Sequence, residues 1–278
     1  MHPFTCELSA SCVGQIALFQ LIMNSVRYFP IAGAVFLIFW VWKKVDWEHF
    51  QIQGKFPGQI WHEIRWSFLT LVIFVAMGSF SIISHKVGWS RVYLDINKYG
   101  VPYLFFSFFL LIVWHETWFY WKHRLVHLRL LFKPVHLVHH RSVNPSPFAG
   151  YSFSLFEAFL EGAYLLIFVF VVPVHPIVAL SQAGYAMIMN IMFHSGYEFY
   201  PSGFTKGLIT RWFNTSTHHN MHHSNVNCNY GLYFNFWDRI MGTNHPKYDE
   251  YFEAVVSRRE SRGTVPLQFL DPSGACDF

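Results

Sequence analysis

The 278-residue chain is apolar and poor in charge: 53% of its residues are hydrophobic, and Asp, Glu, Lys and Arg together make up only 13%. That charged share is about half of the share in soluble globular domains, which argues against a disordered chain or an ordinary soluble enzyme. The net charge of +4 is too small to indicate nucleic-acid binding, but it suits a protein that lies against anionic lipid headgroups. We therefore expect a compact integral membrane protein with a small polar portion.

Long runs with few or no charged residues predict the membrane-spanning segments. Residues 8–42 contain a single charge, Arg27, and form either one span or an interfacial helix followed by a span. Residues 66–85 and 99–115 contain no Asp, Glu, Lys or Arg. Because about 20 apolar residues cross a bilayer, each of these two runs is expected to form one span.

The fourth uncharged run, 162–197, predicts a membrane hairpin and not a single span. Pro173 and Pro176 interrupt the run, and a proline inside a helix removes a hydrogen bond and bends the chain. We expect two helices, at about 159–172 and 177–193. Each is short for a complete crossing of the bilayer.

Basic residues at the ends of the spans predict the topology. Lys43 and Lys44 follow the first span directly, and a basic stretch at 122–141 follows the third, so both are expected on the cytoplasmic side. The hairpin then returns the chain to the same side, which places every histidine-rich segment there. The expected fold is an all-α integral membrane protein, with about four transmembrane segments or hairpins that carry a cytoplasmic histidine-rich helical cap. The N-terminus has no basic region or cleavage pattern, so no signal peptide is expected.

The four cysteines form no CxxC pair, so they predict neither a zinc knuckle nor a thioredoxin-like site. Cys6 and Cys12 are close enough in sequence to pair on the outer side of a membrane. Four scattered thiols are more often simply buried or idle, and that interpretation is favoured here.

Eleven of the 17 histidines fall in two windows, residues 115–140 and 194–223. Within them stand HRLVH (123–127), HLVHH (136–140) and HNMHH (219–223). At this histidine content, random placement would produce the pattern HxxHH only about 0.06 times per chain. Two copies of it therefore indicate a selected function.

The spacing of these histidines indicates metal binding. Residues three and four apart share one face of a helix, so three short helices can direct eight imidazoles at a common centre. A lone HxxxH is more often a pair of surface residues, but three such boxes on one membrane face favour a metal cluster. Eight nitrogen donors exceed what one metal ion holds, which predicts two metals, and sites rich in histidine with open positions suit iron. The eight candidates are His123, His127, His136, His139, His140, His219, His222 and His223.

At this point the sequence resembles a known family. The run from Glu116 through Trp121, His123 and His127, followed by HLVHHRSVNPSPF (136–148), is similar to the fatty acid hydroxylase superfamily. The later segment THHNMHHSNVNCNYGLYFNFWDRIMGT resembles the sterol desaturase branch of that superfamily. The resemblance covers roughly residues 105–245. It implies a membrane di-iron oxygenase in which the eight histidines bind two metals, and it adds His194 as a ninth ligand.

Four further residues are candidates to support the metal ligands. Glu116 lies two helical turns before His123, so it either orients a ligand or caps the polar end of the span. Some family members have a histidine where this chain has Glu198, which either ligates through oxygen or does not ligate. His218 is assigned a place beside the ligands. Asp238 either accepts a hydrogen bond from a ligand imidazole or forms a structural salt bridge with Arg239, and the salt bridge is favoured.

The resemblance divides the chain into an N-terminal transmembrane region of two spans (1–100), a catalytic domain (101–250) and a polar C-terminal tail (251–278). It implies that O2 is a co-substrate and that the product is a hydroxylated or desaturated lipid, sterol-like or fatty acyl, taken from the bilayer. No residue beyond the metal ligands is assigned to catalysis. The expected membrane is the endoplasmic reticulum in a eukaryote and the inner membrane in a bacterium.

The chain contains no reductase motif, so the electrons are expected from a separate cytochrome or ferredoxin. The basic stretch 122–141 is a candidate docking surface for an acidic donor. It can equally contact lipid headgroups.

Two other functions remain open at this point. A di-zinc lipid hydrolase would use a metal-bound hydroxide and would need no electron supply. A metal transport or storage protein would place polar ligands inside the spans, near the midplane of the membrane. The predicted spans hold few such residues, which makes transport the less favoured alternative.

Overall fold

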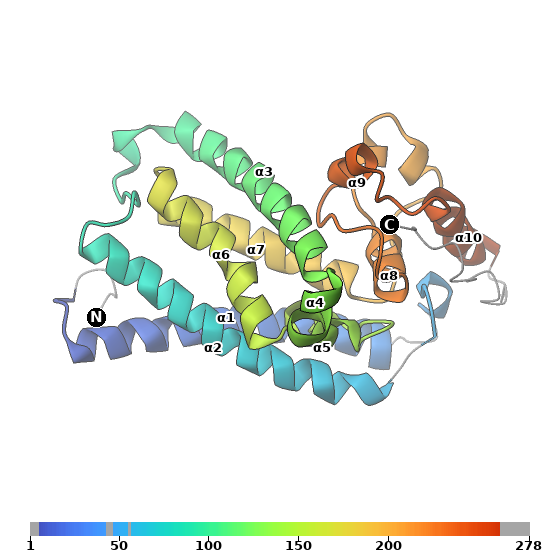
Figure 1. The fold of residues 1–278 in the computed structure, drawn as a ribbon, viewed down its shortest axis with the longest axis horizontal. Helices are drawn as coiled ribbons and strands as arrows, with labels where there is room; N and C mark the ends of the chain where they lie inside the picture. The colour runs from blue at the N-terminus through green and yellow to red at the C-terminus, as the bar shows by residue number, and fades with distance from the viewer. Residues whose placement is uncertain (1–5, 43–46, 55–56, 262–278) are drawn as a thin grey trace.

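The computed structural model describes residues 6–42, 47–54 and 57–261, and most of these residues are helical (Figure 1). In this part of the chain, extended pairing is limited to three isolated bridges. The long helices are α1 (Ala10–Phe36), which continues as the π-helical turn η1 (Leu37–Trp42), α2 (Ile60–Lys86), α3 (Val101–Val126), α6 (Leu155–Val171) and α7 (Pro176–Phe193). The expected all-α fold is confirmed.

Within the described ranges, four helical segments are long and apolar enough to cross a membrane: Ala10–Trp42, α2, α3 and α7. The first of them is one continuous helix of 33 residues, so the alternative with an interfacial helix before the span is wrong. The run after residue 155 forms the predicted hairpin, because α6 and α7 are separated by only four residues. Ser154 caps the start of α6, and His175 caps the start of α7 just before Pro176.

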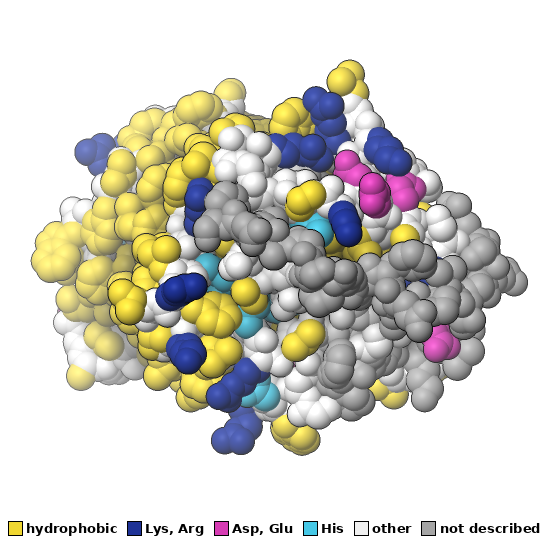
Figure 2. Space-filling model, turned by 45° about the vertical axis from the view of Figure 1, so that its right-hand side comes forward, with side chains coloured by type: hydrophobic (Ala, Val, Ile, Leu, Met, Phe, Trp, Pro, Cys, Tyr) yellow, Lys and Arg dark blue, Asp and Glu magenta, His cyan; other side chains and the backbone are white. Residues whose placement is uncertain are grey.

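The long helices form two layers. Helices α1 and α2 run side by side along the lower edge of Figure 1, while α3, α6 and α7 lie above them. The short turn η6 (Pro147–Tyr151) contacts α1, α2 and α7, and so joins the two layers near one end of the bundle. Hydrophobic side chains cover the outside of the bundle on the left of Figure 2, and Lys and Arg side chains gather along the border of that region.

The short elements that carry the histidine boxes gather at that same end of the bundle (Figure 1). They are α5 (Leu137–His140), α8 (Ser216–Ser224) and η5 (Phe132–His136), which directly follows α4 (Arg129–Leu131). Helix α10 (Tyr248–Ser261) packs against α8, and α9 (Phe236–Met241) follows the third histidine box in the chain. The remaining single turns are η2 (Glu48–Phe50), η3 (Pro57–Gln59), η4 (Ile96–Lys98), η7 (Phe204–Lys206) and η8 (Thr210–Trp212). The first histidine box differs from the expected short helix, since His123 lies in the last turn of the long helix α3 and His127 is its C-cap.

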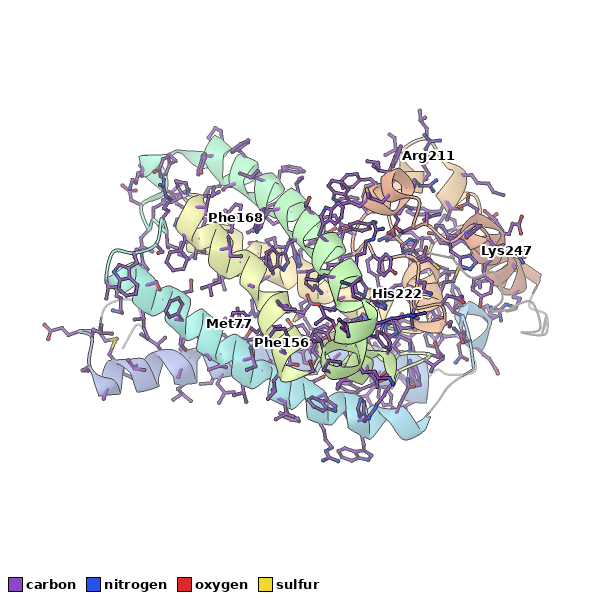
Figure 3. All side chains as sticks on the ribbon, in the orientation of Figure 1. Met77, Phe156, Phe168, Arg211, His222 and Lys247 are labelled. Atoms are coloured by element: carbon purple, nitrogen blue, oxygen red, sulfur yellow. A yellow bond between two sulfur atoms is a disulfide. The ribbon has the colours of Figure 1, made fainter. Side chains whose placement is uncertain are left out.

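The opposite end of the bundle holds a disulfide between Cys6 and Cys12 (Figure 3). The interpretation of these cysteines as idle thiols is therefore wrong. The Lys86 ammonium, at the end of α2, donates to the carbonyl of Cys6 at 2.6 Å, which places the disulfide beside the C-terminus of that helix. Lys43 and Lys44, on which part of the predicted topology rests, lie outside the described residues.

Candidate metal centre

The structure brings all nine predicted ligands together in two adjoining groups of imidazoles. In each group, one ring nitrogen per residue lies within 4.8 Å of the corresponding nitrogens of all the others. The first histidine group consists of His123, His127, His136, His140 and His222, and the second histidine group consists of His139, His194, His219 and His223. Eight of the nine residues are buried, and His127 is partly exposed. A cluster of this composition can hold metal ions.

Helices α5 and α8 each contribute to both groups. Successive residues of a helix point about 100° apart, so His139 faces the second group while His140, its neighbour on α5, faces the first. His222 and His223 divide in the same way on α8. The second group is completed by His194, which stands directly after the last turn of α7.

Backbone carbonyls fix the orientation of three of the rings. The Nδ1 atoms of His123, His194 and His222 lie 2.9, 2.7 and 2.6 Å from the carbonyl oxygens of Tyr230, Asn190 and Cys228, respectively. A carbonyl oxygen only accepts hydrogen bonds, so Nδ1 carries the proton in each of these rings. Nε2 is then unprotonated, and its lone pair points into the group. This is the form of imidazole that binds metals.

The distances between donor atoms fit metal ions. The Nε2 atom of His136 lies 3.1 Å from that of His123 and 3.1 Å from that of His140, and the Nε2 atoms of His194 and His219 are 2.9 Å apart. Two lone pairs at this separation repel each other unless a cation lies between them. Imidazole nitrogens about 2.1 Å from a metal ion and at right angles to one another stand about 3.0 Å apart.

Burial keeps these imidazoles neutral. It lowers the pKa of His194 and of His222 to about 4, and it lowers the pKa of His139, His140 and His219 well below the ordinary value. The rings are therefore uncharged at physiological pH, as metal ligation requires.

Glu157 is a functional residue that the sequence analysis missed. Its buried carboxylate lies 2.6 Å from Nδ1 of His136, so it orients this ring as the carbonyls orient the others. The signal was present in the sequence, because Ser154 and Glu157 form an S-x-x-E pattern of the kind that begins a helix. The predicted start of this helix at residue 159 left Glu157 outside it, whereas α6 begins at Leu155.

Replacing Glu157 with Gln should weaken metal binding about 10- to 100-fold while leaving the fold intact. Glutamine keeps the shape of the side chain but removes the negative charge that the imidazole of His136 faces. Metal content after dialysis against graded chelator, compared with the wild type, measures this effect. Glu250, an exposed carboxylate on α10, supplies the matched control Glu250→Gln, which should change nothing. Equal metal retention by Glu157→Gln and the wild type would refute the assigned role.

Asp238 and Glu116 hold the backbone of one loop, and neither accepts a hydrogen bond from a ligand imidazole. Asp238 accepts from the amides of Tyr230 and Gly231, both at 2.8 Å. Glu116 accepts from the next two amides, those of Leu232 and Tyr233, at 3.1 and 2.7 Å. The loop in turn presents the carbonyl of Tyr230 to His123. Both carboxylates therefore support the metal site through the backbone.

Two earlier interpretations of these carboxylates are thus wrong. Glu116 neither touches a ligand nor caps the end of the span, since its partners are amides of a distant loop. The favoured salt bridge between Asp238 and Arg239 is replaced by other contacts: Asp238 also accepts from the hydroxyl of Thr243, and Arg239 donates to Asn235.

The same loop explains the residues of its NYG motif. Asn229 adopts a left-handed backbone with φ of 60°, which asparagine tolerates better than most residues. A Cβ atom on Gly231 would lie 2.4 Å from the carbonyl oxygen of Phe234 and 2.9 Å from the carboxylate of Asp238. Only glycine therefore lets the loop approach Asp238 closely enough for both amides to bind it.

Glu198 and His218 lie outside both histidine groups. The Glu198 carboxylate accepts from the amide and hydroxyl of Thr217, at 2.9 and 2.7 Å, and so binds the first turn of α8. Its role is to fix the helix that carries the third box. His218 lies with its Nε2 atom 3.8 Å from Asp238, and its ring packs against Tyr248 on α10.

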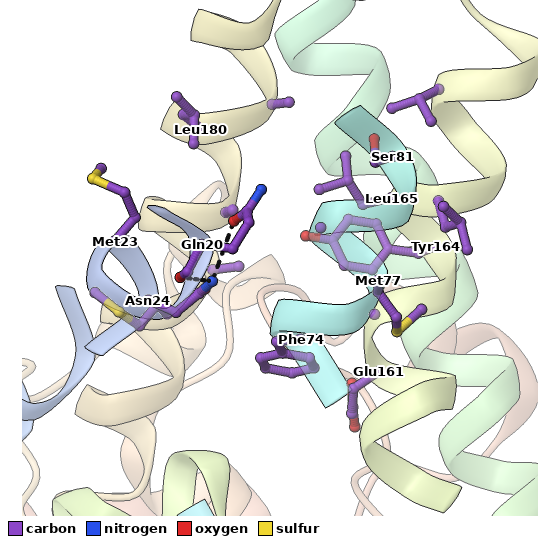
Figure 4. A pocket seen from close by; sticks show the side chains of 18 of the residues that line it. Gln20, Met23, Asn24, Phe74, Met77, Ser81, Glu161, Tyr164, Leu165 and Leu180 are labelled. Atoms are coloured by element: carbon purple, nitrogen blue, oxygen red, sulfur yellow. Dashed lines mark hydrogen bonds between the residues drawn. The ribbon is translucent and has the colours of Figure 1, made fainter. Parts of the chain in front are cut away.

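A cavity of about 250 Å³ lies between the two layers of long helices (Figure 4), and two of its lining residues pack against ligand histidines. Phe119 and Phe153 line it, and their rings pack against His123 and His139 at centroid distances of 5.0 and 5.1 Å. One wall residue therefore touches each histidine group. Most of the remaining lining is aliphatic and aromatic, from α1, α2, α6 and α7.

Comparison with known proteins agrees with this arrangement. A model of the fatty acid hydroxylase family matches residues 108–243. The chain is 29% identical over 206 residues to a Delta(7)-sterol 5(6)-desaturase of Gibberella zeae, with 73% of this chain and 62% of the relative covered. It is 34% identical over 158 residues to lathosterol oxidase of Homo sapiens, with 56% and 51% covered.

A Delta(7)-sterol 5(6)-desaturase of Schizosaccharomyces pombe is 27% identical over 184 residues, with 66% of this chain and 53% of the relative covered. The chain thus spans between about half and three fifths of the length of these curated relatives. No solved structure matches it. The matched segment contains every histidine of the two groups and the loop that Asp238 holds, and over this segment the chain is similar to the fatty acid hydroxylase superfamily, in its sterol desaturase-like branch.

Proposed function

We propose that this protein is a membrane-bound di-iron oxygenase that hydroxylates or desaturates a lipid with O2 and external electrons. The observation that carries the proposal is the pair of buried histidine groups, which pack against Phe119 and Phe153 in the wall of a largely apolar cavity. The five histidines of the first group would hold one iron, and the four of the second group the other. Iron at these positions supplies the redox chemistry that attacks an unactivated C–H bond.

The protein's own residues orient the ligands and exclude water. The carbonyls behind His123, His194 and His222 hold those rings in the tautomer that binds metal. The aromatic rings of Phe119 and Phe153 lie between the cluster and the cavity, so the surface of the cavity next to the metal site is apolar. Such surroundings protect a reactive centre from side reactions with water.

The lipid would enter sideways from the bilayer. Met23 on α1 and Leu180 on α7 lie on the same side of the cavity in Figure 4, opposite Met77 on α2 and Leu165 on α6. The names of the relatives make a sterol-like lipid the first substrate class to test, with fatty acyl lipids as the second.

Replacing Ala183 with Phe should reduce lipid turnover at least tenfold without changing the metal content. Ala183 lines the cavity from α7, and a phenyl ring there would occupy volume that the substrate needs. Turnover and metal content are measured on the same preparation. Gly184→Ala, at a position where an added Cβ meets nothing within 4 Å, is the control. Unchanged turnover by Ala183→Phe would show that the substrate does not use this cavity.

Electrons would come from a separate cytochrome or ferredoxin that docks near the histidine end. The proposed basic surface needs one revision, because Lys122 is buried in an ion pair with Glu161 and cannot meet a partner. Arg129, Lys133 and Arg141 are exposed and remain available to an acidic donor.

We also propose that the metal centre faces the cytoplasm. The disulfide lies at the other end of the bundle, and disulfides persist in oxidising compartments outside the cytoplasm. The membrane would be the endoplasmic reticulum in a eukaryote and the inner membrane in a bacterium. The catalytic domain would span 101–250, after a two-span region at 1–100 and before a polar tail at 251–278.

The test is a lipid profile of cells that express this chain under labelled oxygen, compared with cells that express His139→Ala, His140→Ala. We expect one lipid to gain labelled oxygen, or to lose two hydrogens, only with the intact protein. Metal analysis of the purified protein should find iron. Zinc without iron, together with a product that carries oxygen from water, would overturn the proposal in favour of a lipid hydrolase.

A further inference from the structure

Arg27 is a cation inside the first membrane span that has no acidic partner among the described residues. It lies near the middle of the 33-residue helix Ala10–Trp42 and lines the cavity. Its Nη2 atom donates to the side-chain oxygen of Asn24 at 2.9 Å, and its Nε atom donates to the carbonyl of Met23 at 3.2 Å. Its Nη1 atom is buried and has no hydrogen-bond partner in the described part of the chain.

An unpaired guanidinium at this depth is costly, because burying a charge without a partner is far less favourable than burying a neutral group. Charged residues inside spans usually face a cavity and mark the path or the site of a ligand. The acid that shares the cavity, Glu161, is bound by Lys122 and so does not neutralise Arg27. The remaining donor on Arg27 is therefore available to a ligand.

Two amide side chains extend the polar surface around Arg27. Asn24 donates to the carbonyl of Gln20 at 2.8 Å and to its side-chain oxygen at 3.4 Å, as the dashed lines in Figure 4 show. Gly78 on α2 makes room for this arrangement, since a Cβ atom there would lie 2.7 Å from the Gln20 side chain. The three residues Gln20, Asn24 and Arg27, here called the α1 polar patch, all line the cavity.

Arg27 marks the part of this patch that lies toward the metal centre. The next residue, Tyr28, donates to the carbonyl of Phe148 at 2.7 Å, in the segment that follows the second histidine box. Tyr28 also stacks on Tyr151, which lines the cavity, with ring centroids 4.1 Å apart. Away from the metal centre, the lining near the tip of the hairpin is largely apolar, with Val92, Val169, Val174 and Pro176.

We propose that the α1 polar patch binds an anionic oxygen group on the lipid, a carboxylate or a sulfate, while the apolar body of the lipid extends toward the tip of the hairpin. Guanidinium donors suit such groups because they form charge-assisted hydrogen bonds to two oxygens at once. This inference rests on the proposed function only in calling the lipid a substrate. It adds that the substrate is acidic, and that oxidation takes place near its polar end.

Binding of matched acidic and neutral lipids to the purified full-length protein in nanodiscs tests the inference, with native mass spectrometry as the readout. Palmitate is compared with hexadecanol, and cholesterol sulfate with cholesterol. The wild type should bind the acidic member of at least one pair about tenfold more tightly, as expected for a hydrogen bond to a charged group. Arg27→Met should abolish that preference, and Arg27→Lys should retain part of it.

A preference within the palmitate pair would identify a carboxylate, and one within the sterol pair a sulfate. Equal binding of acidic and neutral lipids by the wild type would overturn the inference, whether or not Arg27→Met folds. If folded Arg27→Met lost its binding of the acidic and the neutral lipid equally, the inference would also be overturned, because Arg27 would then have a purely structural role. His139→Ala separates this site from the oxygenase, because it should lose lipid oxidation and keep the preference for acidic lipids. A wild type that shows this preference but oxidises no lipid would refute the proposed function and leave the anionic site standing.

Discussion

Replacing His219 and His223 together with alanine should reduce the bound metal from two ions to one and abolish lipid oxidation. The two substitutions remove two of the four donors of the second histidine group, and the two that remain cannot hold an ion against competing chelators. The first group keeps all five donors and should keep its ion. The complementary triple variant, His123→Ala with His127→Ala and His136→Ala, leaves two donors in the first group and should likewise leave one ion, held by the second group. Metal content by elemental analysis measures both results.

His49 supplies the control, because it is a histidine outside both groups that packs against Phe50. His49→Ala should retain two ions and full activity. Two ions in the His219, His223 variant would contradict the assignment of the second group. The loss of both ions from a variant that remains monodisperse would contradict the division into two independent groups.

The histidine boxes and their membrane setting could be predicted because both depend on short-range patterns. Charge-free runs give the spans, and spacings of three and four give a shared helix face. The division of the ligands between the two metal positions could not be predicted in the same way. His139 and His140 are neighbours in sequence but serve different groups, and their assignment depends on which distant histidines come to lie beside each of them in the fold.

The supporting carboxylates show a second limit of sequence reasoning. Glu116 and Asp238 were expected to act on imidazoles or as caps and salt bridges, because those partners lie nearby in sequence. Glu116 instead binds amides that lie 116 and 117 positions after it in the chain, while Asp238 binds amides seven and eight positions before it. No local pattern records such a contact.

The first 100 residues were expected only to span the membrane, but they also support the metal site. The hydroxyl of Tyr28 on α1 and that of Ser67 on α2 both donate to the carbonyl of Phe148. The carboxylate of Glu63 binds Ser146 in the same segment. These contacts hold the chain that leaves the second histidine box, so the N-terminal spans and the histidine cap act as one structure.

Replacing Asp238 with Asn should destabilise the protein and disorder the first histidine group. Burial raises the pKa of Asp238 to about 6, so the group is a carboxylate at neutral pH and accepts from two amides and one hydroxyl. Asparagine has the same shape, but its NH2 group would face one of the two amide N–H donors. Leaving a buried donor unsatisfied costs about 1–3 kcal/mol, and the lost charge weakens the remaining bonds as well.

The effect should reach the metal through the loop. If the amides of Tyr230 and Gly231 lose their acceptor, the carbonyl of Tyr230 no longer holds Nδ1 of His123, and that ring becomes free to turn. Thermal unfolding in detergent, followed by tryptophan fluorescence, measures the stability, and metal affinity is measured on the folded protein at lower temperature. Glu250→Gln, at an exposed carboxylate on α10, controls for the loss of one negative charge. A variant that unfolds earlier yet binds metal as tightly as the wild type would show that Asp238 supports the fold without orienting His123.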